Sequence, residues 1–166
     1  MIDALVGDGY PLDRVWLAHT DADTLVPPDW LARHLAYAAE GWASVLGAVE
    51  VEDWSPRPPG TARVFHRPAA QVPEDRRVHG ANLGVRADSY LAVGGFPALG
   101  VSGDHALAAA LRELGVPVIH AAEVKVTTSA RLSTRAGGGF SDCLSALGPH
   151  SRIGPADDPD QGSADR

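Results

Sequence analysis

This sequence of 166 residues has little cysteine and no long apolar run. The single cysteine, Cys143, excludes an internal disulfide and any zinc site built on cysteines. No stretch approaches the roughly eighteen apolar residues of a membrane-spanning helix. Asp3, Asp8 and Asp13 interrupt the start of the chain, which lacks the basic and apolar blocks of a secretory signal. We therefore expect a cytoplasmic protein.

Positive charge is also scarce, because the chain has a formal net charge of −7. This balance argues against a nucleic-acid partner, since such proteins need basic surfaces to neutralise phosphates. The last part of the chain is acidic and contains Gly, Pro and Ser. We expect residues 149–166 to be a disordered tail. Residues 1–148 are then of the right size for one domain with a single core.

The apolar pattern predicts alternating strands and helices. Strands are predicted where short apolar runs are bounded by turn residues, at 14–19, 44–52, 82–86 and 117–126. Helices are predicted where apolar residues recur at helical spacing, at 29–41, 88–93 and 104–114. Between them, residues 53–78 contain several prolines and read as a long irregular loop. This order predicts an α/β fold of three layers, α/β/α, with a small parallel sheet covered by helices on both faces.

Two helices carry specific expectations. The helix 29–41 is expected to begin with Asp29 as its N-cap and to bury an apolar face of Leu31, Leu35 and Ala38. The helix 104–114 is expected to end at Gly115 and to bury a stripe made of Leu107, Ala110, Leu111 and Leu114.

One feature of nucleotide-binding α/β domains is missing. Such domains open with a strand and a glycine-rich or acidic turn. Here only about a dozen residues precede the first expected strand, and Gly7-Asp8-Gly9 follows no strand. Either a nucleotide is held in another way, or the front of the domain is absent.

Asp21 and Asp23 are the first candidate site residues. They follow a buried strand, and ligands bind at the carboxyl ends of strands in open α/β sheets. Two carboxylates suffice for Mg²⁺ or Mn²⁺ when substrate phosphates and water complete the coordination. A second Asp-x-Asp occurs at Asp158 and Asp160, and a turn with a helix cap explains the same residues, so the pattern alone leaves both interpretations open.

Asp104 is the second candidate. At the start of an apolar helix it is suited to be an N-cap, yet it shares a helical face with Leu107 and Leu111 and could point into a cleft as a general base. His105 beside it is an alternative base or ligand. No pair of histidines has the spacing of a zinc site.

The segment 126–140, VTTSARLSTRAGGGF, is the third candidate. Arg131 and Arg135 lie four residues apart and lead into three glycines, and paired guanidinium groups with free backbone amides suit a diphosphate. A flexible basic linker is the other interpretation. The chain has no Gly-x-Ser-x-Gly nucleophile motif.

Taken in order, four segments over roughly residues 13 to 145 resemble bacterial family 2 glycosyltransferases of the GT-A fold. They are HTDADTLVPPDWL, HGANLGVRADSYLAVGGFP, GDHALAAALRELG, and VTTSARL followed by RAGGGF. The resemblance implies a partial, Rossmann-like GT-A sheet with flanking helices. It implies that residues 1–148 are the catalytic and acceptor half of such a domain, without its N-terminal nucleotide-binding part.

By this resemblance, the protein is a metal-dependent inverting transferase that moves a sugar from a nucleotide-diphosphate-sugar to a hydroxyl acceptor (a sugar, lipid or small molecule). Asp21 and Asp23 hold the divalent ion, Mn²⁺ or Mg²⁺, and Asp104 deprotonates the acceptor. Arg131 and Arg135 bind the donor diphosphate. The loop that approaches donor sugar and acceptor consists of His79, Gly80, Ala81 and Asn82.

Two positions depart from the family pattern. Gly103 stands where the family has a glutamate before the aspartate, and Thr127, Thr128 and Ser129 lie near the position of a further histidine ligand. Two other hypotheses remain open. The chain is either a non-catalytic remnant or complementation module that docks on a separate N-terminal half or forms a homo-oligomer, or it is a nucleotidyltransferase of similar fold. The latter lacks support, because no glycine-rich basic signature for a triphosphate is present.

Overall fold

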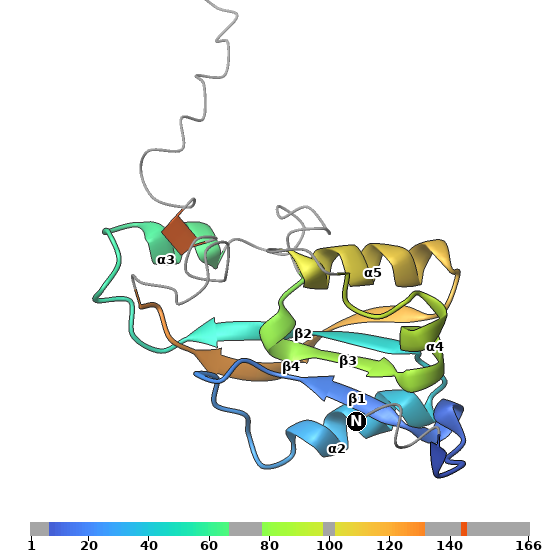
Figure 1. Ribbon diagram of the computed structural model, residues 1–166. Coiled ribbons are helices and arrows are strands. Elements are labelled where there is room, and N and C mark those ends of the chain that lie inside the picture. Colours follow the sequence, from blue (N-terminus) through green and yellow to red (C-terminus); the bar gives the residue numbers. More distant parts are fainter. Residues whose placement is uncertain (1–6, 67–77, 98–101, 132–143, 146–166) are drawn as a thin grey trace, which may run out of the picture.

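The computed structural model describes residues 7–66, 78–97, 102–131 and 144–145 (Figure 1). A four-stranded mixed sheet forms its centre, with the spatial order β1-β3-β2-β4. The bounds of the strands are Trp16–His19 for β1, Ser44–Val51 for β2, Leu83–Arg86 for β3 and Val118–Thr128 for β4. All four strands were expected from the sequence, with ends that differ by at most two residues.

The expectation of a parallel sheet is correct for three strands and wrong for β3. This strand pairs antiparallel with both β1 and β2, whereas β2 and β4 are parallel. The chain leaves β2 at its carboxyl end and begins β3 at Leu83, which pairs with His19, the last residue of β1. The carboxyl ends of three strands and the amino end of β3 therefore share one edge of the sheet.

Helices cover both faces of this sheet, so the three-layer α/β/α architecture is confirmed (Figure 1). Helix α2 (Trp30–Ala39) lies on one face, and α4 (Ala87–Ala92) and α5 (Gly103–Glu113) lie on the other. Each face has its own core. Val45 and Val49 of β2 pack in the core that contains Trp30, while Leu46 packs with α5. This alternation follows from the two-residue period of a strand.

Helix α2 buries a different face from the expected one. Leu31 and Leu35 are 49% and 48% exposed, and Trp30 and His34 are buried instead. Both buried side chains lie within hydrogen-bond distance of the Asn82 side chain, which favours this orientation of the helix. Asp29 does precede the helix, but its carboxylate pairs with Arg33 one turn later and makes no bond to the backbone of the first turn.

Helix α5 fits its expectation more closely. Leu107 and Leu111 are buried together with Ala108, whereas Leu114 is 47% exposed because the helix ends before it. Gly115 follows with a φ of +78°, the left-handed conformation that glycine adopts most easily at a helix end. Ser102, and not Asp104, is the residue that precedes the helix.

Three short elements complete the described chain: the 3-10 turns η1 (Leu12–Arg14) and η4 (Gly80–Asn82), and helix α3 (Thr61–Phe65). Helix α3 interrupts the segment that was expected to be irregular throughout. No helix among the described residues is long and apolar enough to span a membrane. The expected tail, Arg135 and Cys143 lie outside the described residues.

Candidate functional site

Asp21 and Asp23 lie in a tight turn that follows β1. The Thr24 N–H donates to the Asp21 carbonyl at 3.1 Å, which closes the turn. Leu25 then forms two backbone hydrogen bonds with Thr127, of 2.8 and 3.0 Å. The Thr24 hydroxyl adds a hydrogen bond of 3.0 Å to the hydroxyl of Thr128. The turn is thus fixed to the end of β4, at the edge of the sheet where three strands end.

Arg131 lies against this turn. Its Nη1 is 3.1 Å from Oδ2 of Asp23, with the two side chains 49% and 27% exposed. Residues 108 positions apart in the sequence are therefore brought together at one end of the sheet. The structure joins two sequence candidates that were expected to serve the same ligand, a carboxylate for a cation and a guanidinium for an anion.

The Asp104 carboxylate bridges two elements of the site. Its Oδ2 accepts the Gly80 N–H at 2.8 Å, and its Oδ1 accepts the His105 N–H at 2.9 Å. Gly80 lies so near that an added Cβ would be 3.5 Å from Oδ2. Asp104 is therefore not an N-cap of its helix. It connects the first turn of α5 to the loop that precedes β3.

Negative charge accumulates around Asp21. Partial burial raises the pKa of Asp21, and the neighbouring charges of Asp23 and Asp104 raise it further, while Arg131 acts in the opposite direction. A carboxylate is destabilised in this way when like charges surround it and too little positive charge compensates them. A divalent cation would supply that compensation.

His79 is a partly buried base in the same loop. Burial lowers the pKa of His79 to about 4, with His105 and His120 acting in the same direction and the Asp104 charge acting against them. The imidazole is consequently neutral at neutral pH. Asp104 thus accepts a hydrogen bond from Gly80 and raises the pKa of His79, against the larger effect of burial.

Asn82 holds the loop in the core and is completely buried. Its Oδ1 accepts the Trp30 indole N–H at 2.9 Å and lies 3.3 Å from Nε2 of His34. Its Nδ2 donates to the carbonyls of Ala48 and Val124 at 2.7 and 2.8 Å. The side-chain amide is thus fully used inside the protein and positions the loop. Contact of residues 79–82 with donor or acceptor stays a prediction.

The Asn82 side chain also forms hydrogen bonds at an irregularity of the sheet, the register shift between β2 and β4. The register of β2 against β4 shifts after Gly47, which pairs with Ala121, because the next residue of β2, Ala48, pairs with Lys125. At this shift Asn82 donates to one backbone carbonyl on each strand, that of Ala48 on β2 and that of Val124 on β4. A Cβ on Gly47 would overlap the Asn82 side chain. The position of the Asn82 side chain therefore requires a glycine at position 47.

A pocket of about 220 Å³ opens beside the ion pair. Its walls come from the turn after β1, the chain that follows β2 and the end of β4, with the lining residues Asp23, Leu25, Glu52, Asp53, Pro56, Thr127, Thr128, Ser129 and Ala130. Carboxylate and hydroxyl groups lie beside apolar surface in this lining. Two of its carboxylates are already engaged: that of Asp23 by Arg131, and that of Asp53 by Ser55.

The residues present fit a divalent ion only in part. Among the described ranges, no three histidine, cysteine or acidic side chains gather closely enough to form a complete metal site. Asp21 and Asp23 offer oxygen ligands, the type that Mg²⁺ and Mn²⁺ accept, and burial together with the charges of Asp23 and Asp104 raises the pKa of Asp21. The remaining ligands would have to come from a substrate and water.

One residue of the site was missed from the sequence. Arg57 is 6% exposed and its guanidinium contacts the backbone of residues 130 and 131. The available signal was its position, at the start of a basic stretch within a long proline-containing segment. Nothing in the sequence pattern marks it as buried, because arginine is mostly exposed in proteins.

No protein-family model matches this sequence, and no curated protein matches it. Its structure is similar to that of the mannosyltransferase PcManGT from Pyrobaculum calidifontis in complex with GDP-Man and Mn²⁺. The TM-score is 0.52 at 20% sequence identity, over 81% of this chain and 37% of the mannosyltransferase chain. The chain thus spans little more than a third of that protein. At this level of identity the likeness concerns the fold: a mixed α/β sheet with flanking helices, shared with a solved glycosyltransferase.

Proposed function

We propose that this chain forms the catalytic and acceptor half of a metal-dependent, inverting glycosyltransferase of family 2. The reaction moves a sugar from a nucleotide-diphosphate-sugar to a hydroxyl acceptor. The observation that carries the proposal is the 3.1 Å contact between Asp23 and Arg131 at the carboxyl edge of the sheet. A cation ligand and an anion ligand at one point suit a metal diphosphate, which carries both charges.

On the donor side, Asp21 and Asp23 would hold Mn²⁺ or Mg²⁺. When bound, the ion would neutralise charge that develops on the leaving diphosphate. Arg131, and Arg135 by prediction, donate hydrogen bonds to oxygens of the donor diphosphate. Such preorganised positive groups stabilise the transition state more than the ground state, because the negative charge grows as the glycosidic bond breaks.

On the acceptor side, Asp104 acts as the general base. The acceptor hydroxyl oxygen forms a bond to the anomeric carbon, its proton passes to the Asp104 carboxylate, and the nucleoside diphosphate leaves with the electron pair of the broken bond. The hydrogen bonds that Asp104 accepts from two backbone N–H groups would keep its carboxylate in one orientation. His105 is the alternative base. His79, neutral through burial, adds no positive charge that would compete with the donor ion.

Release of nucleoside diphosphate tests this proposal directly. The chain is incubated with Mn²⁺ and GDP-mannose or UDP-glucose, with and without simple glycoside acceptors. We expect Asp104→Asn to lower release by about a hundredfold, within the range typical of general-base catalysis. Asp23→Asn should abolish its dependence on Mn²⁺. The matched control is Asp29→Asn, an exposed carboxylate that pairs with Arg33 on α2. Equal release by all variants would contradict the assignment of both residues.

A second candidate is a complementation module that becomes active only with another polypeptide. The observation in its favour is that β1 lies at the edge of the described sheet and pairs only with β3 among the described strands. Open edges of sheets accept further strands. In this case the chain alone gives no release, and release appears when a separately produced nucleotide-binding half of a glycosyltransferase domain is added. Release by the chain alone would rule this candidate out.

A further inference from the structure

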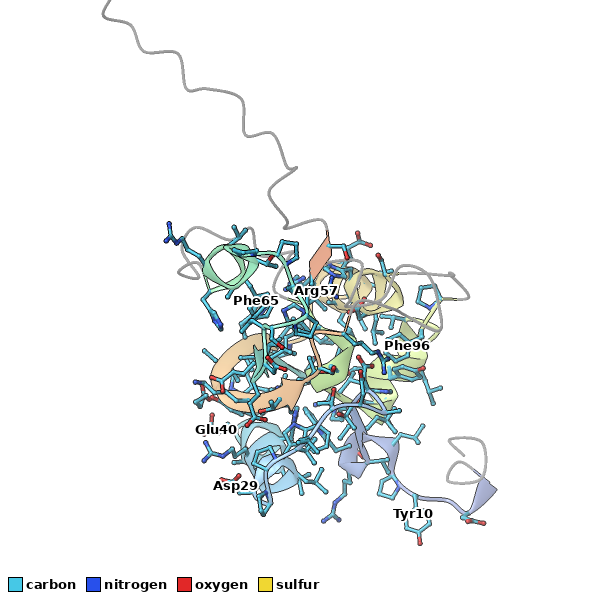
Figure 2. All side chains as sticks on the ribbon, turned by 90° about the vertical axis from the view of Figure 1, so that its left-hand side faces the viewer. Tyr10, Asp29, Glu40, Arg57, Phe65 and Phe96 are labelled. Carbon is cyan, nitrogen blue, oxygen red and sulfur yellow. The ribbon has the colours of Figure 1, made fainter. Side chains whose placement is uncertain are left out.

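Arg57 is a charged residue in an unusual environment. It follows β2 and is 6% exposed, and its backbone N–H donates to the Trp54 carbonyl at 2.9 Å. Figure 2 shows its place close to α3 and to residues 144–145. Burying a guanidinium is costly unless its donors are satisfied by hydrogen bonds. Its contacts therefore indicate what it does.

All three nitrogens of the guanidinium are engaged. Nε donates to the Ala130 carbonyl at 2.8 Å, and Nη2 donates to the Arg131 carbonyl. Nη1 donates to the Ser145 hydroxyl at 2.8 Å. Bonds from a charged donor are stronger than neutral ones, and here two of them fix consecutive peptide groups. Arg57 thus defines the path of the backbone from which the Arg131 side chain emerges.

The geometry points to Arg57 as a positioning residue. We propose that it holds residues 130 and 131 in place and so keeps the Arg131 guanidinium beside Asp23. This inference rests on the proposed function in one respect, namely that Arg131 binds the donor diphosphate. A lysine could not replace it, because a single ammonium group cannot serve three acceptors in the planar, fixed arrangement of a guanidinium.

The first experiment measures the local anchoring without any ligand. Trypsin cleaves after arginine, so mass spectrometry can follow cleavage after Arg131 and, in α5, after Arg112 in the same sample. In Arg57→Lys we expect cleavage after Arg131 to be about tenfold faster relative to cleavage after Arg112, because two charge-assisted bonds to that backbone are lost or weakened. The matched control is Arg63→Lys, an exposed arginine of α3. If both sites accelerate equally, or neither does, local anchoring is refuted.

The second experiment measures coupling between the two arginines. Affinity for GDP-mannose in Mn²⁺ is determined for Arg57→Lys, Arg131→Gln and the double variant. We expect Arg57→Lys to weaken binding about tenfold in the wild-type background and hardly at all when Arg131 is already replaced, because positioning acts only through the positioned group. Additive losses would overturn the proposal, since they would mean that Arg57 acts independently of Arg131.

The two experiments separate the inference from the proposed function. Selective cleavage after Arg131 in a chain that binds no nucleotide-sugar would establish the anchoring and contradict the proposed function. If the affinity for GDP-mannose is unchanged in the Arg57 and Arg131 variants, the positioning role is overturned and other residues must carry the transferase chemistry.

Discussion

Replacing Arg131 with glutamine should change the affinities for Mn²⁺ alone and for the complete donor in opposite directions. The guanidinium lies 3.1 Å from Asp23, where it would compete with a cation for that carboxylate. With donor, the same guanidinium is expected to bind the diphosphate. The substitution therefore removes a competitor in the first case and a ligand in the second.

The size of the first effect follows from the exposure of the pair. The two side chains are 49% and 27% exposed, so solvent screens much of their attraction. Partly exposed pairs of this kind contribute about 0.5–1 kcal/mol. Loss of the pair should thus strengthen Mn²⁺ binding by about two- to fivefold. The second effect is larger, about tenfold or more in the opposite direction, because charged hydrogen bonds to a diphosphate contribute about 1.5–3 kcal/mol.

Electron paramagnetic resonance of free Mn²⁺ measures the first affinity, and calorimetry with GDP-mannose in saturating Mn²⁺ measures the second. Arg33→Gln is the control, because it breaks another exposed pair of an arginine with an aspartate, on α2. If Arg131→Gln weakens both affinities together, or changes neither, then Arg131 does not exchange between Asp23 and the diphosphate. The reasoning would then be refuted.

Three further predictions test the loop and its supports. The pKa of His79 is lowered from 6.5 to about 4, so the unfolded chain takes up a proton first as the pH falls. About 2 kcal/mol of the free energy of unfolding should therefore be lost between pH 8 and pH 5. His79→Phe should flatten this pH profile in urea unfolding, and parallel profiles for the variant and the wild type would contradict the prediction. Asp104→Asn keeps one of the two acceptor oxygens and should lose less thermal stability than Asp104→Ala, while both variants lose turnover; turnover retained by the asparagine variant would exclude a base. Gly47→Ala should destabilise by about 1–3 kcal/mol by displacing Asn82, unlike Gly7→Ala, whose methyl group meets no atom within 4 Å; equal urea midpoints would show that the core adapts.

Local patterns were sufficient for most elements of the fold. The strands and the helices α2, α4 and α5 were expected from apolar period and turn residues, and Gly115 ends a helix as its conformational freedom predicts. The place of Asp21 and Asp23 at the carboxyl end of β1 was expected because they directly follow an apolar run, while their role as metal ligands stays a prediction. These features depend on residues near one another in the sequence.

The exposed face of α2 shows where this reasoning fails. Leucines were expected to face the core, because burial of apolar surface is the general rule. In the structure Trp30 and His34 take that place, since Asn82 lies there to accept from the indole N–H. Trp30 packs against the apolar core and also donates to Asn82, and no periodicity of the helix itself could reveal this distant partner.

The sequence by itself determined the α/β class, most element bounds and the identity of the acidic and basic candidates, since each depends on short-range spacing. Only the tertiary structure decided the reversed direction of β3, the meeting of Asp23 with Arg131, and the burial of Arg57 under residues 130 and 131. The physical reason is the range of the interactions. Strand pairing and buried charge are satisfied by partners that lie tens of residues away, and no local pattern specifies which partner a group will meet.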